Sequence, residues 1–166
     1  TLSTQMKATG EVMSVGRTIE ESLLKAVRSL ETGVCHLYMK KFDDIKTEDI
    51  LAYIKTGTDD RIFAISELIR RNVDLGLICN ATQIDMLFLE KIKNIIDLER
   101  EIKEKRLDKD MLYTAKKAGF CDKFIAKLWG ISEDEVYAFR KENGIFPVYK
   151  MIDTCASEFE SYIPYF

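Results

Sequence analysis

The stretch IDMLFLEKIKNIIDLEREIKEKRL, residues 84–107, decides the fold of this chain. Its apolar residues recur at spacings of three, four and seven, the repeat of one buried helix face; they are Phe88, Ile92, Ile95, Ile96 and Ile102. Charged residues dominate from Glu99 to Arg106. The pattern predicts one long helix whose first half enters a core, while its interleaved acidic and basic residues, Glu99 among them, form a solvated face.

The composition bounds the class of protein. A chain of 166 residues is long enough for one domain with its own core. Apolar residues make up 46% and charged residues 32%, as in soluble globular proteins, and no run approaches the roughly 18 apolar residues of a membrane span. The net charge of -3 argues against general nucleic-acid binding, because such binding depends on a basic surface.

The cysteines predict a reducing, cytoplasmic setting. Cys35, Cys79, Cys121 and Cys155 are scattered without a CxxC pair, and no secretory signal is evident. The one histidine, His36, lies beside Cys35 without a second ligand pair, so no zinc site is expected. Adjacent side chains seldom face each other, which argues against a catalytic Cys35–His36 pair. We expect His36 to be a satisfied structural side chain, and Cys79 and Cys121 to be buried small hydrophobes.

A capping box opens the first predicted helix, which covers residues 19–32. The Thr18 side chain can accept from the backbone N–H of Glu21, whose carboxylate can reach back to the cap. Gly33 can adopt the left-handed conformation that ends a helix. The buried stripe of this helix is expected to contain Ile19, Leu23, Ala26, Val27 and Leu30.

Caps, glycines and a lack of proline before residue 147 predict further short helices on both sides of the long one. Thr47 is expected to cap one of them and Thr58 or Asp59 the next. The predicted ranges are 47–54, 58–71, 74–81, 109–118, 122–129 and 132–143. A non-helical linker, residues 34–46, is expected to pack on the body through its aromatic residues. The short loops predict an all-α fold, an irregular orthogonal helical bundle.

The two ends of the chain lack helical periodicity and are expected to be extended. In residues 1–17, Gly10 and Gly16 are interpreted as turn residues, because the GxGxxG and GK[ST] patterns of phosphate loops are missing. Residues 145–166 are expected to form an ordered extended segment with a short helix near Ala156. Aromatic residues close the sequence, which suggests neighbours from something larger than this chain.

Residues 119–144 offer an alternative function. Two short helices joined by Gly130–Ser132 have the spacing of a helix-turn-helix, whose second helix would enter a DNA groove. That second helix begins with Glu133, Asp134 and Glu135, which phosphates and base edges would repel. Carboxylates there complement the helix dipole, so a structural interpretation is preferred to DNA binding.

The remaining candidate side chains are interpreted as structural. The pairs Asp43–Asp44 and Asp59–Asp60 lie at capping or loop positions, where aspartate commonly binds backbone N–H groups. Trp129 is expected to be a core or interface anchor. We therefore predict no catalytic, cofactor-binding or metal-ligating residue in this chain.

Five separated motifs carry a family resemblance. They are TQMKATGEVMSVGRTIEESLLKAVRSLE (4–31), DRIFAISELIRR (60–71), IDMLFLEKI (84–92), GFCDKFIAKLWG (119–130) and GIFPVYKMIDTCASEFESYIPY (144–165). In this order they resemble the large chain of carbamoyl phosphate synthetase, from the end of its first ATP-grasp unit, through its helical oligomerisation domain, toward the second unit. The resemblance covers essentially the whole chain. One departure is Cys121, where family members often have a capping serine.

The resemblance implies a division into three parts. Residues 1–18 would be a remnant of the preceding carboxyphosphate (ATP-grasp) domain, 19–146 the helical oligomerisation domain, and 147–166 a linker toward the second ATP-grasp domain. Cys155, in the DTCA motif, would then be structural.

The resemblance also implies a function in which this chain is not catalytic. The parent enzyme makes carbamoyl phosphate from bicarbonate, glutamine-derived ammonia and two ATP, for pyrimidine and arginine synthesis. ATP and Mg or Mn would bind the ATP-grasp units alone, so this chain would hold no cofactor. Its partners would be the flanking ATP-grasp domains, other large chains and the glutaminase small subunit, without nucleic acid or membrane.

Overall fold

A computed structural model describes residues 12–30, 32–152 and 163–165. Its helices are α1 (Ile19–Ser29), α2 (Thr47–Tyr53), α3 (Arg61–Arg70), α4 (Leu75–Thr82), α5 (Met86–Glu104), α6 (Lys109–Lys117), α7 (Asp122–Trp129) and α8 (Glu133–Glu142), with a 3-10 turn η1 (Lys40–Phe42) before α2. The all-α prediction, with extended segments outside the helices, is confirmed. The helix predicted near Ala156 lies outside the described residues.

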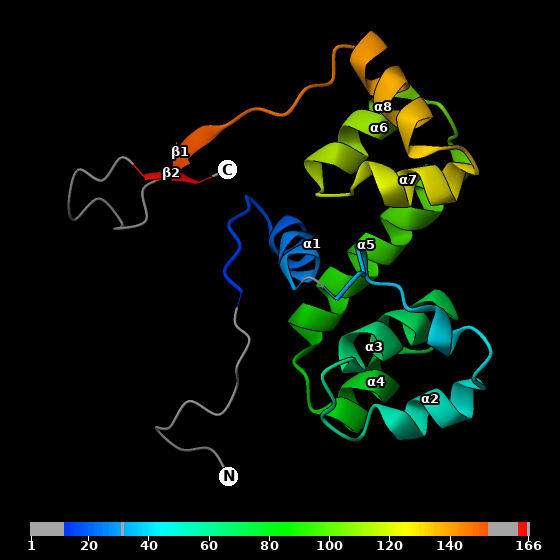
Figure 1. The fold of residues 1–166 in the computed structure, drawn as a ribbon. Coiled ribbons are helices and arrows are strands. Elements are labelled where there is room, and N and C mark those ends of the chain that lie inside the picture. The colour runs from blue at the N-terminus through cyan, green and yellow to red at the C-terminus, as the bar shows by residue number, and fades with distance from the viewer. Residues whose placement is uncertain (1–11, 31, 153–162, 166) are drawn as a thin grey trace.

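Helix α5 runs diagonally through the molecule and connects its two ends (Figure 1). Helices α2, α3 and α4 lie at one end, α6, α7 and α8 lie at the other, and α1 packs near the middle. Helices α1, α3, α4, α6 and α7 all contact α5 directly. Beyond α8, strand β1 (Lys150–Ile152) pairs antiparallel with β2 (Ile163–Tyr165).

The buried face of α5 differs from the predicted stripe at two positions. Ile92, Ile95, Ile96 and Ile102 are buried as expected, but Phe88 is 52% exposed while Leu89 is fully buried. Either residue fits the helical repeat, because Phe88 lies four positions and Leu89 three positions before Ile92. The helix begins at Met86 with Asp85 as its N-cap, and Leu89 is the one that faces the core.

Helix α1 shows the same ambiguity. Leu24 is fully buried where the predicted stripe has Leu23, and Ile19 and Leu30 of that stripe are exposed. The helix ends at Ser29, before the predicted Thr32, although Gly33 does have a positive φ of 77°.

Side-chain caps are present at the N-termini of both α1 and α8. Ser132 and Glu135 form a complete capping box at α8. At α1, Thr18 accepts from the N–H of Glu21, but the Glu21 carboxylate accepts from the N–H of Arg17 instead of Thr18, so this box is incomplete.

Two predicted caps are wrong by one or two positions. The N-cap of α2 is Lys46 instead of Thr47, and that of α3 is Asp60 instead of Thr58 or Asp59. Neither Lys46 nor Asp60 makes a side-chain capping bond.

The linker of residues 34–46 is non-helical apart from η1 and packs on the body, as predicted. Arginine side chains secure it: Arg71 donates through Nη2 to the carbonyl of Phe42 (2.8 Å) and through Nη1 to that of Ile45 (2.6 Å). Carbonyl groups in this non-helical linker lack helical hydrogen bonds, and the arginine side chain provides their donors.

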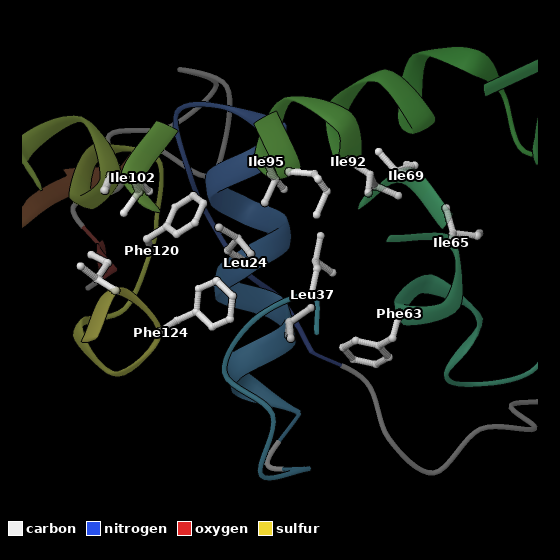
Figure 2. Close-up of a cluster of buried hydrophobic side chains, with 14 of the residues drawn as sticks. Leu24, Leu37, Phe63, Ile65, Ile69, Ile92, Ile95, Ile102, Phe120 and Phe124 are labelled. Carbon is white, nitrogen blue, oxygen red and sulfur yellow. The ribbon is translucent and has the colours of Figure 1, made fainter. Parts of the chain in front are cut away.

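One apolar core connects the two ends of the molecule (Figure 2). Leu24 and Leu37 lie between Phe120 and Phe124 on one side and the α3 residues on the other. Because α1 and the linker fill this middle position, the two ends share a continuous core.

Candidate functional site

His36, Arg70 and Glu99 form a buried charged group, the central polar cluster, where the linker, α3 and α5 meet. Arg70 donates to both carboxylate oxygens of Glu99, at 3.0 Å from Nε and 2.8 Å from Nη2, and Nη2 also reaches the carbonyl of Leu37 at 2.6 Å. His36 Nε2 lies 3.4 Å from Glu99 Oε2, and the imidazole ring stacks on Phe124 with centroids 3.7 Å apart. The cluster joins three segments that are distant in sequence.

Burial and charge set the protonation states in the central polar cluster. Burial acts to raise the pKa of Glu99, but contacts with His36 and Arg70 outweigh it and lower this pKa to about 2. Burial lowers the pKa of His36 below its usual value, against the opposing effect of Glu99. At neutral pH the cluster therefore contains a neutral imidazole, a carboxylate and a guanidinium.

The structure corrects two predictions here. Glu99 does not belong to a solvated face, since its side chain is 14% exposed. His36 is structural but not satisfied, because neither ring nitrogen has a hydrogen-bond partner. The 3.4 Å contact to Glu99 is therefore electrostatic, and aromatic packing against Phe124 and Phe120 holds the ring.

Cys35 and His36 contact different residues, in agreement with the argument against a catalytic pair. Cys35 lies against Cys121, whose Sγ is 3.6 Å from the Cys35 carbonyl oxygen. Cys121, predicted to be a buried small hydrophobe, is the N-cap of α7 and is only half-buried, packed against the core. Cys79 on α4 is also half-buried, and Cys155 lies outside the described residues.

One aspartate of each predicted pair accepts hydrogen bonds from other side chains. Asp60 is buried and accepts from Lys41, from the Tyr53 hydroxyl (2.5 Å) and from the Thr58 hydroxyl (2.9 Å). Asp43 accepts from the Tyr38 hydroxyl at 2.5 Å, and this hydrogen bond raises the pKa of Tyr38 to about 12. These aspartates bind side chains rather than the backbone N–H groups that we predicted.

The α7–α8 pair has the predicted helix-turn-helix arrangement, with Gly130 in the left-handed conformation between the helices. Trp129 is 3% exposed and donates through Nε1 to the carbonyl of Ile102 at 2.7 Å. The prediction of a core anchor is confirmed for Trp129. Glu133, Asp134 and Glu135 form the first turn of α8 and are exposed.

Two apolar grooves flank α1. The first, the α1–α5 groove, has a volume of about 610 Å³ and is lined by Ser14, Gly16, Arg17, Thr18, Ile19, Ser22, Leu23, Ala26, Ile62, Ile84, Phe88, Lys91 and Ile92. The second, of about 700 Å³, lies between α1, α5 and α6 and includes Leu98, Thr114, Lys117 and Phe120. Ile19 and Phe88, two of the residues that the predicted stripes placed in the core, are exposed apolar residues of the first groove.

The central polar cluster has no access to these grooves. A carboxylate beside a neutral imidazole is an arrangement that acid–base catalysis uses. However, Arg70 already occupies both oxygens of Glu99, His36 is 1% exposed, and none of the three residues lines either groove. The cluster instead holds the linker, α3 and α5 together.

Two general features concern the part of the chain that the structure describes. It contains no group of three or more His, Cys, Asp or Glu residues that could hold a metal ion. None of its helices combines the length and the apolar content that crossing a bilayer demands.

Sequence reasoning missed Glu99 and the Cys35–Cys121 contact, for different reasons. Glu99 follows Ile92 by seven positions and precedes Ile102 by three, so a charge on the buried stripe was visible in the sequence. The two cysteines are 86 positions apart, and no local pattern reports their contact.

Comparison with known families assigns the chain. The sequence profile of the carbamoyl-phosphate synthetase large chain, oligomerisation domain, matches residues 11–144, which include every helix from α1 to α8. This range contains the central polar cluster, both cysteines of the Cys35–Cys121 pair and the grooves beside α1. The chain belongs to the family of carbamoyl-phosphate synthetase large chain oligomerisation domains.

Proposed function

We propose that this chain is a non-catalytic domain through which large chains of carbamoyl phosphate synthetase associate with each other. The family match over residues 11–144 carries the proposal. The parent enzyme would be the glutamine-dependent, cytoplasmic ligase that makes carbamoyl phosphate for pyrimidine and arginine synthesis. ATP, Mg or Mn and the glutaminase subunit would bind elsewhere in that enzyme.

The domain division follows from the same proposal. Residues 1–18 would end the preceding ATP-grasp unit, 19–146 would form the association domain, and 147–166 would lead toward the second unit. The start of α1 at Ile19 and the end of α8 at Glu142 support these limits. In this arrangement the helical domain separates two catalytic units.

The α1–α5 groove is the surface that we propose for association. Ile19 and Phe88 are 42% and 52% exposed there, and the groove between them is lined largely by apolar side chains. A two-fold dimer places the same patch on both partners, so an exposed aromatic residue at the rim of an apolar groove can enter the groove of the second copy. Lys91 and Glu20, paired at 3.4 Å, would lie at the polar edge.

Sedimentation equilibrium of the full chain and of Phe88→Glu tests the proposal. Phe88 is the third residue of α5, where a carboxylate complements the helix dipole, so the substitution should not weaken the fold. We expect the wild type to associate and the variant to do so at least about tenfold more weakly. The control is Tyr137→Glu on α8, which removes a similarly exposed aromatic residue, 53% exposed, that does not line the groove.

Each contrary result has a distinct meaning. A wild-type chain that stays monomeric at all concentrations overturns self-association through this domain. Association that Phe88→Glu leaves unchanged overturns the choice of surface, and the groove would then belong to a flanking unit. Tight, magnesium-dependent binding of ATP in a calorimetric titration of the chain would overturn the non-catalytic role.

A further inference from the structure

The side chains of Cys35 and Cys121 are in contact across the boundary between the linker and α7. When protonated, Cys121 can donate to the Cys35 carbonyl oxygen, 3.6 Å from its Sγ, and the two thiol groups are also within hydrogen-bonding reach of each other. Both residues are half-buried and pack against the edge of the core. Neither the family match nor the proposed association requires this arrangement.

The surroundings of Cys121 favour its ionised form. It is the N-cap of α7, so the positive end of the helix dipole lies beside it, although the Phe124 N–H donates to its carbonyl oxygen and its sulfur makes no capping hydrogen bond. The hydrogen bond from Cys35 is the largest effect, and together with Phe124, Arg28 and Lys116 it lowers the pKa of Cys121 to about 6, against its burial.

The surroundings of Cys35 have the opposite effect. Its hydrogen bond to Cys121 and its burial raise the pKa of Cys35 above its usual value. The pair therefore contains one thiolate, which can act as a nucleophile, and one thiol held beside it, which is the arrangement of an attacking and a resolving cysteine.

We propose that Cys35 and Cys121 form an oxidation site, in which hydrogen peroxide converts the two thiols to a disulfide. The Cys121 thiolate attacks one peroxide oxygen; an S–O bond forms, the O–O bond breaks, and the hydroxide that leaves takes up a proton to become water. The Cys35 sulfur, after losing its proton, attacks the sulfur of the Cys121 sulfenic acid. The S–O bond breaks and a second water leaves. Two thiols are oxidised and one peroxide is reduced.

The disulfide would connect segments that only non-covalent contacts now join. The Cys121 sulfur already lies 3.6 Å from the main-chain carbonyl oxygen of Cys35, so the bond would join two segments that are in contact. The bond would fix the linker, which carries His36, onto the helix that carries Phe124, the ring on which His36 stacks.

The first test treats the full chain with one equivalent of hydrogen peroxide. We expect loss of the mass of two hydrogen atoms, and a digest in which the peptides of Cys35 and Cys121 are joined. The matched control Cys79→Ser removes another half-buried thiol and should behave as the wild type. A disulfide that joins any other pair, or none, overturns the proposal.

The variants Cys121→Ser and Cys35→Ser separate the two roles. Cys121→Ser should lose the reaction while keeping a good N-cap for α7. Cys35→Ser should stop at the sulfenic acid, which adds the mass of one oxygen and is trapped by dimedone. Should Cys121→Ser fail to fold, Cys35→Ser and Cys79→Ser still test the pair. Disulfide formation in Cys35→Ser contradicts the assigned partner.

A second measurement follows alkylation by iodoacetamide. A lowered pKa gives Cys121 a larger thiolate fraction at pH 6 but also makes that thiolate a weaker nucleophile. We expect the first effect to dominate, so that Cys121 is alkylated about tenfold faster than Cys79. The rate for Cys121 should rise through an inflection near pH 6. Equal rates for Cys121 and Cys79 at pH 6 overturn the role of Cys121 as the attacking thiolate.

Discussion

Glu99 is a carboxylate inside a helical core, and it is tolerable there because of its partners. A buried ion pair loses hydration energy that its mutual attraction only partly returns, so its presence says little about net stability. Removing one partner is different, because the other charge is then left buried and unpaired, at a cost of about 3 to 5 kcal/mol. Arg70, whose side chain is 15% exposed, would keep only its 3.6 Å contact with Glu67 and its hydrogen bond to the Leu37 carbonyl.

The protonation states of Glu99 and His36 predict loss of stability in acid. For both groups the folded pKa is below the unfolded one, so the unfolded chain binds more protons and the free energy of unfolding falls as the pH falls. The His36 contribution is lost below about pH 6.5. The Glu99 contribution is lost between pH 4.5 and about 2, and a shift of this size corresponds to about 3 kcal/mol.

Urea unfolding of Glu99→Gln at pH 7, 5 and 3 checks this expectation. The variant should be less stable at pH 7 and should lose less stability than the wild type from pH 5 to 3. The control is Asp97→Asn, a change at a half-exposed carboxylate two residues away on α5, which should keep the acid dependence that comes from Glu99. If the free energy of unfolding fell equally with pH for the wild type and for Glu99→Gln, the role assigned to Glu99 would be contradicted.

At the scale of the helix, the sequence predicts elements better than it predicts faces. Caps such as Asp108 and Ser132 and the left-handed Gly130 act within four residues, so the helices that they bound were predicted almost to the residue. The face of a helix depends on what packs against it. Where two adjacent apolar residues both fit the repeat, as in Leu23–Leu24 and Phe88–Leu89, periodicity cannot choose between them.

Alanine substitutions in α1 test which face the helix buries. Leu24→Ala should lower the free energy of unfolding by about 2 to 5 kcal/mol, because it opens a cavity beside Phe120 and Phe124. Ile19→Ala, at the 42% exposed position of the same helix, should cost less than about 1 kcal/mol. Chemical denaturation measures both. The reverse ranking would mean that α1 packs with the face that the sequence stripe predicted.

At the scale of the molecule, the contacts that sequence reasoning could not supply are the long-range ones. The all-α bundle follows from local periodicity and short loops, whereas the linker, α3 and α5 meet at Glu99 only because the chain folds back on itself. The burial of Glu99 could have been predicted, because this charged residue lies at the same helical spacing as the apolar residues of α5 that face the core. Its partners Arg70 and His36, like the Cys35–Cys121 contact, depend on the tertiary fold.

The continuous core predicts that both ends of the molecule unfold together. Trp129 reports on the α6–α8 end through its fluorescence, while far-UV circular dichroism averages over all helices. We expect the two signals to follow one transition. Ile96→Ala, at a fully buried position of α5, should move both midpoints equally, and Leu87→Ala, at a 49% exposed one, should move neither. Separate transitions would show two independent cores.

Helix α5 also has a mechanical consequence. Its 19 residues make a rod of about 28 Å at about 1.5 Å per residue. A tilt of about 5° at one end would shift the other end by about 2.5 Å, because so short a helix bends little. Helices contact α5 toward both of its ends, so we expect α5 to act as a rigid connection that transmits a displacement of the α2–α4 end to the α6–α8 end.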